Sequence, residues 1–277
     1  MKEFLRTKDH SVTGEAFTLM LDEDMEMLRT EPIPPNVDRY YESDTYISHT
    51  DARASMVEKL YQIVKRRNLQ GKVKLITRNN KTGKRLLDFG AGTGDFLVTA
   101  KEKGWEIEGV EPSPIAQENA RKKGLRLCGS VKELQNKKFD VITLWHVLEH
   151  VPNLEEQIGE LEGLLANDGT LIVAVPNFRS YDAKRYGTFW AAYDVPRHVW
   201  HFSRNAIPKL FQKVNLEVVA TRPMFFDSFY VSLLSEKYKT GQNRYLSAFW
   251  NGLKSNLKAS RTKEYSSVIY ILRRKEA

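Results

Sequence analysis

The most chemically informative stretch of the sequence is Asp88-Phe-Gly-Ala-Gly-Thr-Gly94, in which three glycines alternate with other residues directly after an apolar run. Glycine tolerates positive φ and has no Cβ, so a ligand can lie directly against the main chain of such a turn. A second apolar run ends at Glu111. If the two runs are parallel neighbouring strands, the Glu111 carboxylate lies beside the glycine turn, where a ribose diol is its natural partner.

The spacing of the glycines restricts the kind of nucleotide. A dinucleotide fingerprint requires Gly-x-Gly-x-x-Gly, whereas here Asp95 occupies the last position and the third glycine comes one residue early, at Gly94. The sequence therefore favours a nucleoside cofactor other than NAD.

Two later clusters carry side chains suited to proton transfer or acceptor binding. His146, Glu149 and His150 stand at i, i+3 and i+4, which places them on one face if that turn is helical. Such a set could hold a divalent metal or act as a base. The second cluster runs from residue 190 to 203, where aromatic rings could stack on an acceptor, a cation could hold an acidic group, and an imidazole could take a proton. These residues are Trp190, Arg197, His198 and Trp200.

The glycine turn, together with Val110-Glu-Pro-Ser113, resembles the cofactor site of class I S-adenosylmethionine-dependent methyltransferases. Residues 139–151 resemble the fourth strand and following turn of that family, and residues 164–177 resemble its fifth helix-strand unit. The resemblance implies S-adenosyl-L-methionine as the cofactor. The cofactor contacts that it implies are Asp88, Gly90, Ala91, Gly92, Gly94, Glu111, Pro112, Ser130, Trp145 and His146.

The resemblance also implies an α/β fold. We expect a doubly wound, seven-stranded Rossmann-like sheet with helices on both faces, the strand order 3-2-1-4-5-7-6 and an antiparallel last strand. Residues 1–36 are expected to form a small ribbon-like segment without zinc ligands, and residues 37–80 a helical lid and connector. The methyltransferase core would then occupy residues 81–277, with a helical insertion at about 223–265.

In similar methyltransferases an aromatic segment ahead of the first strand folds over the cofactor, which makes Tyr41, Tyr46 and His49 candidate lid and substrate contacts. The turn after the fourth strand looks like the Glu-x-x-Glu-His element of ubiquinone-biosynthesis O-methyltransferases, where magnesium has a role. Here His146 replaces the first glutamate, and we therefore expect no metal. His150 and His198 remain as the predicted catalytic residues.

The implied activity is methyl transfer to a small-molecule acceptor, with oxygen favoured over nitrogen or carbon. Residues 144–147 read Leu-Trp-His-Val, unlike the Asn-Pro-Pro-Tyr element of base-amino methyltransferases, and Cys128 lies outside a Pro-Cys context. A nucleic-acid substrate is thus disfavoured. Two alternatives stay open: methylation of RNA or another polyanion, and a non-catalytic cofactor-binding protein that docks on a polyanion or membrane.

Composition sets broader limits. The 277 residues carry a net charge of +8 and a pI near 9.3, which fits either a solvated basic surface or an anionic partner. The lone Cys128 excludes an intramolecular disulfide, charges interrupt every apolar run in residues 1–20, and no run approaches the ~20 residues of a membrane span. We expect a cytoplasmic protein, and the sequence does not specify its oligomeric state.

Residues 226–261 are predicted to form two helices. In the second, Leu246, Phe249, Trp250, Leu253 and Leu257 make an apolar stripe, with lysines and an arginine off it. Packing against the neighbouring helix or roofing the substrate pocket is the favoured interpretation. Peripheral contact with a membrane surface through residues 226–261 is the alternative.

Overall fold

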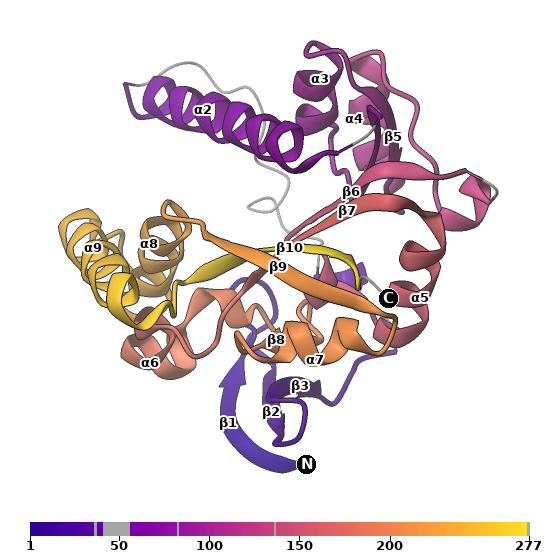
Figure 1. The fold of residues 1–277 in the computed structure, drawn as a ribbon. Helices are drawn as coiled ribbons and strands as arrows, with labels where there is room; N and C mark the ends of the chain where they lie inside the picture. Colours follow the sequence, from indigo (N-terminus) through magenta and orange to yellow (C-terminus); the bar gives the residue numbers. More distant parts are fainter. Residues whose placement is uncertain (36–37, 41–55, 82, 136, 276–277) are drawn as a thin grey trace.

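A computed structural model describes residues 1–35, 38–40, 56–81, 83–135 and 137–275. Its central feature is a six-stranded sheet in the order β5 (Glu106–Val110), β4 (Arg85–Phe89), β6 (Phe139–Trp145), β7 (Leu165–Pro176), β10 (Ser267–Arg274) and β9 (Leu216–Pro223) (Figure 1). The pairs β5–β4, β4–β6 and β6–β7 are parallel, and β10 is antiparallel to both neighbours. This is the expected order without its first edge strand, which is reduced to a parallel bridge between Val110 and Cys128.

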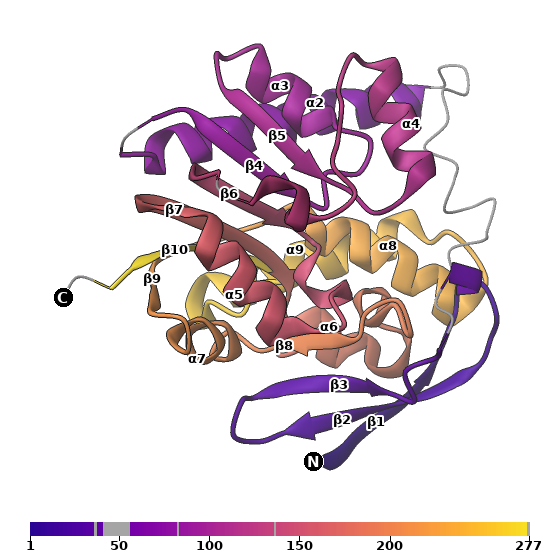
Figure 2. The same cartoon turned by 90° about the vertical axis from the view of Figure 1, so that its right-hand side faces the viewer.

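Alternate strand residues bury opposite faces of the sheet, as the period of two dictates. On one face, Leu86 and Val141 pack with α2 (Met56–Asn79), α3 (Asp95–Lys101) and α4 (Pro114–Lys122). On the other face, Leu87 and Ile142 pack with α5 (Leu154–Leu164) and α7 (Ala206–Gln212). Figure 2 shows the two helical layers on either side of the sheet. The α/β fold with helices on both faces is therefore confirmed.

The N-terminal residues form an antiparallel ribbon of β1 (Lys2–Lys8), β2 (Ala16–Asp22) and β3 (Met27–Glu31). Its last strand pairs with β8 (Trp200–Phe202), which lies in the segment that follows β7 (Figure 2). The ribbon therefore shares one sheet with the stretch in which Arg197 and His198 lie.

Two helices connect β9 to β10, as expected: α8 (Asp227–Thr240) and α9 (Tyr245–Thr262). Their packing differs from the favoured expectation. The buried face of α9 consists of small residues, namely Ala248, Gly252, Ser255 and Ala259. The apolar stripe is turned outward, with Leu246 80% and Trp250 65% exposed. Small residues occupy the buried face because they let the axes of α8 and α9 approach closely. A Cβ at Gly252 would lie 2.9 Å from the Phe229 Cα.

Candidate functional site

The glycine turn lies at the carboxyl end of β4, where the chain enters α3. Gly90, Gly92 and Gly94 all have positive φ, at 74°, 54° and 78°. The Gly90 and Ala91 amides donate to the Val110 carbonyl at 2.8 and 2.9 Å, which fixes the turn against the end of β5. Among the described residues, a Cβ at Gly92 would meet no atom within 4 Å, so the middle of the turn faces open space. That opening suits a ligand packed on the main chain.

Glu111 lies beside this turn, as the parallel pairing of β4 and β5 predicted. One carboxylate oxygen accepts from the Gly92 amide at 2.8 Å and the other from the Ser113 amide at 3.0 Å. Each carboxylate oxygen has a second lone pair. Glu111 can therefore keep both main-chain contacts and still accept from a pair of ligand hydroxyls.

Asp88 is the buried acid of the site, with 3% of its surface exposed. The Thr143 hydroxyl donates to its Oδ1 at 2.6 Å. Burial raises the pKa of Asp88 to about 7, against the opposing influence of Thr143 and Lys72. Bringing a second cation close would lower this pKa again, because an opposite charge favours the ionised carboxylate.

Trp145, the last residue of β6, has its ring edge against Phe96, with 5.7 Å between ring centroids. The ammonium of Lys72 in α2 lies 4.4 Å from the centre of the indole ring, within cation–π range. The indole Nε1 is buried and has no hydrogen-bond partner among the described residues. A buried donor without an acceptor is costly, and a bound ligand could supply one.

His146 connects the end of β6 to the helical insertion. Its backbone has a φ of 57°, its Nε2 lies 2.9 Å from Asp227 Oδ2, and its Nδ1 lies 3.4 Å from Glu149 Oε1. Burial alone would lower the pKa of His146, but the two carboxylates outweigh it and raise the pKa to about 10. His146 is therefore a cation that holds α8 to the site, a role that the predicted cofactor contact did not include.

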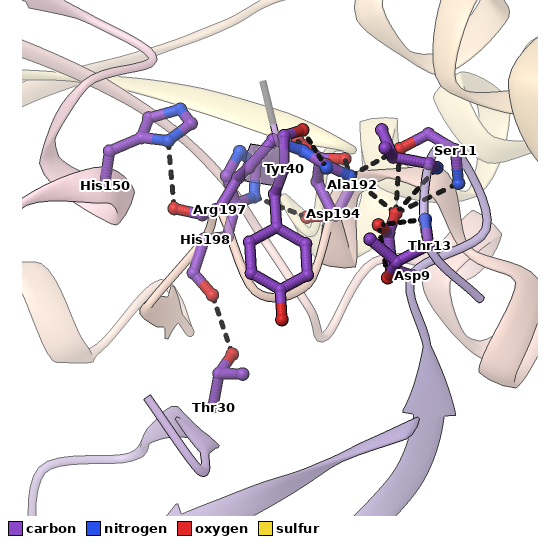
Figure 3. Close-up of polar contacts among 11 residues, drawn as sticks. Asp9, Ser11, Thr13, Thr30, Tyr40, His150, Ala192, Asp194, Arg197 and His198 are labelled. Carbon is purple, nitrogen blue, oxygen red and sulfur yellow. Dashed lines mark hydrogen bonds and ion pairs between the residues drawn. The ribbon is translucent and has the colours of Figure 1, made fainter. Parts of the chain in front are cut away.

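The predicted bases His150 and His198 come together around Glu149. The rings of the two histidines meet edge to face with centroids 4.5 Å apart. His150 Nδ1 lies 3.0 Å from the Arg197 carbonyl and His198 Nδ1 lies 2.9 Å from the Ala192 carbonyl (Figure 3). Because a carbonyl only accepts, both Nδ1 atoms carry the hydrogen, and in the neutral rings both Nε2 atoms keep a lone pair.

The charge state of this cluster follows from its burial. Burial lowers the pKa of His150 to about 4, with a further contribution from His198. Burial alone would raise the pKa of Glu149, but the surrounding histidines bring it below its usual value. The cluster thus combines an ionised Glu149 carboxylate with a neutral His150 imidazole. Glu149 Oε1 is paired with His146 Nδ1 at 3.4 Å, and neither Glu149 oxygen has a closer hydrogen bond within the part of the chain that the structure describes.

One ligand atom from each of Glu149, His150 and His198 falls within 4.8 Å of the other two, a spacing that could hold a metal ion. Two imidazoles and a carboxylate suit a transition metal better than magnesium, which prefers oxygen. The charged His146 beside Glu149 opposes a second cation at the same carboxylate. Because of this charge, we still predict that the cluster holds no metal.

Arg197 is 2% exposed, and all three guanidinium nitrogens have protein partners. Nη2 lies 3.0 Å from Asp9 Oδ1 and 2.7 Å from Asp194 Oδ1, Nε donates to the second Asp194 oxygen, and Nη1 donates to the Tyr40 carbonyl. Figure 3 shows this network joining the N-terminal ribbon to the segment that carries His198. The geometry favours a structural role over the predicted contact with an acidic substrate group.

The remaining predicted cofactor and substrate contacts differ in burial and in their hydrogen-bond partners. Trp190 is 2% exposed, and its Nε1 donates to Asp182 at 2.8 Å, so it packs in the interior. The Trp200 Nε1 donates to the Val151 carbonyl at 2.9 Å. Ser130 caps a short helical turn two residues after the Val110–Cys128 bridge, and Pro112 directly follows Glu111. Tyr41, Tyr46 and His49 lie outside the described residues.

Three further residues at the site were not predicted from the sequence, namely Lys72, Thr143 and Asp227. Lys72 comes from the helix before the glycine turn, and Asp227 from the first turn of α8. Neither lies in a motif, and only the folded arrangement brings them to the site. Thr143 could have been found from the sequence: it lies two residues before Trp145 within an apolar run of β6, and the parallel β4–β6 register places it directly opposite Asp88.

Comparison with known proteins defines the class. The family model of the methyltransferase domain matches residues 61–221, which is more than half of the chain. The chain therefore belongs to the methyltransferase domain family, and its fold is that of a class I S-adenosylmethionine-dependent methyltransferase. This confirms the expected class and agrees with S-adenosylmethionine as the expected cofactor.

Individual relatives are more distant. A ubiquinone biosynthesis O-methyltransferase of Glaesserella parasuis serovar 5 is 29% identical over 128 residues, covering 40% of this chain and 54% of that protein. The chain thus matches about half the length of the curated relative. A magnesium protoporphyrin IX methyltransferase from Synechocystis PCC 6803, solved with bound S-adenosylhomocysteine, superposes with a TM-score of 0.56 at 14% identity, covering 86% of this chain and 99% of that one. A cyclopropane synthase from Mycobacterium tuberculosis gives a TM-score of 0.50 at 15% identity, covering 73% and 82%.

Proposed function

We propose that this protein transfers a methyl group from S-adenosylmethionine to an oxygen atom of a small-molecule acceptor. The observation that carries the proposal is the pair of imidazoles at His150 and His198, both anchored through Nδ1 and both adjacent to the Glu149 carboxylate. An oxygen acceptor needs its proton removed, and a neutral imidazole beside a carboxylate is a suitable base. The similarity to ubiquinone biosynthesis O-methyltransferases supports oxygen as the acceptor atom.

The residues of the glycine turn fit the cofactor. Glu111 would accept from the ribose hydroxyls, the open space at Gly92 would receive the ligand against the main chain, and Trp145 would line the same end of the sheet. Asp88 would supply negative charge for the cationic part of the ligand. When bound, S-adenosylmethionine supplies an electrophilic methyl group attached to a positively charged sulfur.

The chain's own contribution to the reaction is alignment and proton removal. His198 Nε2 would accept the hydroxyl proton, which leaves the acceptor oxygen with the electron pair that nucleophilic attack requires. The Glu149 carboxylate would stabilise the imidazolium that results. His150, whose pKa is depressed to about 4, stays neutral in this scheme and orients its neighbours.

The proposal is tested by incubating the purified protein with S-adenosylmethionine and a panel of phenols, catechols and carboxylic acids. Formation of S-adenosylhomocysteine and of a product heavier by one methylene group is followed by mass spectrometry. An O-methylated product supports the proposal. Turnover only with amine acceptors, or only with RNA added as a further acceptor, contradicts the assignment of the acceptor atom or class.

A further inference from the structure

Helix α9 has two opposite faces of different composition. Successive residues turn by about 100° around a helix, so Gly252 and Ala259 lie about 180° from Trp250 and its neighbours. The first face, made of Ala248, Gly252, Ser255 and Ala259, is buried. We call the second the α9 face; it consists of Leu246, Phe249, Trp250, Leu253 and Leu257. Leu246, Phe249, Trp250 and Leu257 are 80%, 52%, 65% and 62% exposed.

The outward direction of the α9 face is fixed by the packing on the other side. The Ser255 hydroxyl donates to the buried Asp182 carboxylate at 2.7 Å. The Gly252 backbone lies so close to Phe229 of α8 that a side chain would not fit, and the Gly252 carbonyl accepts from the Ser228 hydroxyl at 3.2 Å. Rotating the helix to bury its large residues would break all of these contacts.

Exposed aromatic residues on α8 and just before it extend the apolar surface of the insertion. Phe225, Phe226 and Tyr230 are 52%, 56% and 57% exposed. The Phe229 and Phe249 rings join the two helices, with centroids 5.6 Å apart, and Phe249 also contacts Trp250 at 5.8 Å. Large exposed apolar residues gathered on one element mark an interaction surface rather than ordinary scatter.

The charge of the insertion restricts its partner. The cations of residues 225–263 are Lys237, Lys239, Arg244, Lys254, Lys258, Arg261 and Lys263. The acids of the same stretch are Asp227, which is paired with His146, and Glu236, which accepts from Tyr186, Ser247 and Asn251. Both acids are therefore engaged within the protein. An anionic partner complements this surface, whereas a second copy would bring like charges together.

The partner must also accommodate aliphatic side chains. Leu246 and Leu257 gain nothing from a nucleic acid, whose surface is phosphate and base edges, but they gain from hydrocarbon. Lys254 and Lys258 lie beside the apolar stripe, and their ammonium groups are 5.8 and 4.2 Å from the centre of the Tyr181 ring. Aromatic and leucine residues on one face with lysines along its edge are typical of a helix that lies in a membrane interface.

We propose that the α9 face docks on the surface of an anionic lipid bilayer, with α9 parallel to the membrane plane. The inference does not depend on the acceptor proposed above. In the part of the chain that the structure describes, no helix is long and apolar enough to cross a bilayer. The contact is therefore peripheral and combines insertion of side chains with attraction between lysines and lipid phosphates.

Trp250 provides a direct readout, because it is 65% exposed, whereas Trp105 and Trp190 are buried and Trp145 and Trp200 are half-buried. The full chain is mixed with phosphatidylcholine vesicles, with or without about one-third phosphatidylglycerol. Binding is measured by co-sedimentation, and insertion by quenching of tryptophan fluorescence with brominated acyl chains. We expect binding to the anionic vesicles, quenching that disappears in Trp250→Phe, and a loss of affinity as salt is raised.

Two double variants separate the components. Phe249→Ser/Trp250→Ser and Lys254→Glu/Lys258→Glu should each weaken vesicle binding at least about tenfold. Lys101→Glu/Lys103→Glu makes the same charge change near the end of α3 and should bind nearly as the parent does. Thermal unfolding is recorded for every variant, and only variants that unfold like the parent are compared. Absence of vesicle binding, binding without quenching of Trp250, or a dimer in solution that either α9 variant abolishes would overturn the proposal.

Discussion

The main-chain amide of Gly92 donates a hydrogen bond of 2.8 Å to the Glu111 carboxylate, which joins the glycine turn after β4 to the end of β5. The second Glu111 oxygen accepts from the Ser113 amide, so the carboxylate is oriented before any ligand arrives. Preorganised acceptors of this kind lose little conformational entropy on binding. Glu111 is accordingly the residue on which the cofactor site depends most.

Replacing Glu111 by alanine should reduce the affinity for S-adenosylmethionine at least about 100-fold. Hydrogen bonds to charged groups contribute about 1.5–3 kcal/mol each, and two of them to a ribose diol exceed the ~2.7 kcal/mol that corresponds to 100-fold. The matched control is Glu118→Ala, an exposed glutamate of α4 whose partner is Arg121. Calorimetric titration measures both. An unchanged affinity in the Glu111 variant would show that the cofactor site lies elsewhere.

Asp88 should make the ligand-free protein less stable as the pH rises. Its pKa is raised from 3.8 to about 7, so its contribution is fully present below pH 4 and is lost as the pH increases through 7. Each unit of pKa corresponds to about 1.4 kcal/mol, which makes about 4 kcal/mol an upper limit for the whole loss and about 3 kcal/mol an upper limit for the part above pH 5. Urea unfolding at pH 5 and pH 8 measures the change in the free energy of unfolding. In Asp88→Asn this change should be smaller by the contribution of Asp88. A variant with the same pH dependence as the parent would contradict the assignment.

His198→Ala should lower turnover by about 10²–10⁴-fold, the usual contribution of a positioned base, while cofactor affinity stays unchanged. His10→Ala is a suitable control, since His10 also bonds a backbone carbonyl, that of Thr188, but lies in the turn between β1 and β2. Turnover is measured with the best acceptor of the panel, and binding by calorimetry. Full activity in the His198 variant would show that His198 is not the base.

Removal of divalent metal should leave turnover unaffected. The His146 imidazolium, whose pKa is raised to about 10, already compensates the Glu149 charge at 3.4 Å. Activity is compared before and after dialysis against a chelator, and again after adding zinc or manganese. A loss of activity that the metal restores in the parent, but not in Glu149→Gln, would show that Glu149, His150 and His198 hold an ion.

Arg197→Leu should lower the free energy of unfolding by about 3–5 kcal/mol, because it leaves the Asp9 and Asp194 carboxylates without their shared cation. Arg39→Leu removes an exposed ion pair with Glu15 and should change the stability far less. Urea unfolding measures both. If Arg197 instead held an acidic substrate, stability would change little and the KM for acidic acceptors would rise.

The cofactor half of the site was predictable because its residues follow strand ends in one continuous pattern. Parallel pairing of β4 with β5 dictates that Glu111 lies beside the glycine turn, and the chemistry of both residue types is specific. Lys72 and Asp227 were not predictable, since they come from α2 and α8, and no spacing in the sequence relates them to Trp145 or His146.

The sequence also did not show which partner or which face a side chain turns toward. Arg197 was identified as a functional cation, but its partner Asp9 lies 188 residues away in the N-terminal ribbon, and only the folding of the ribbon onto residues 188–202 brings the two together. The hydrophobic stripe of α9 was identified correctly as a stripe. Periodicity shows on which side of a helix the large residues gather, but not which side is buried. In α9 the small residues form the buried side.

The assigned cofactor site is tested most directly by calorimetric titration of the purified protein with S-adenosylmethionine, S-adenosylhomocysteine and, as a control, NAD. We expect one site per chain with micromolar affinity for the first two ligands and no heat of binding for NAD. If neither adenosyl ligand binds, the glycine turn and Glu111 serve another purpose, and methyl transfer by this protein is contradicted.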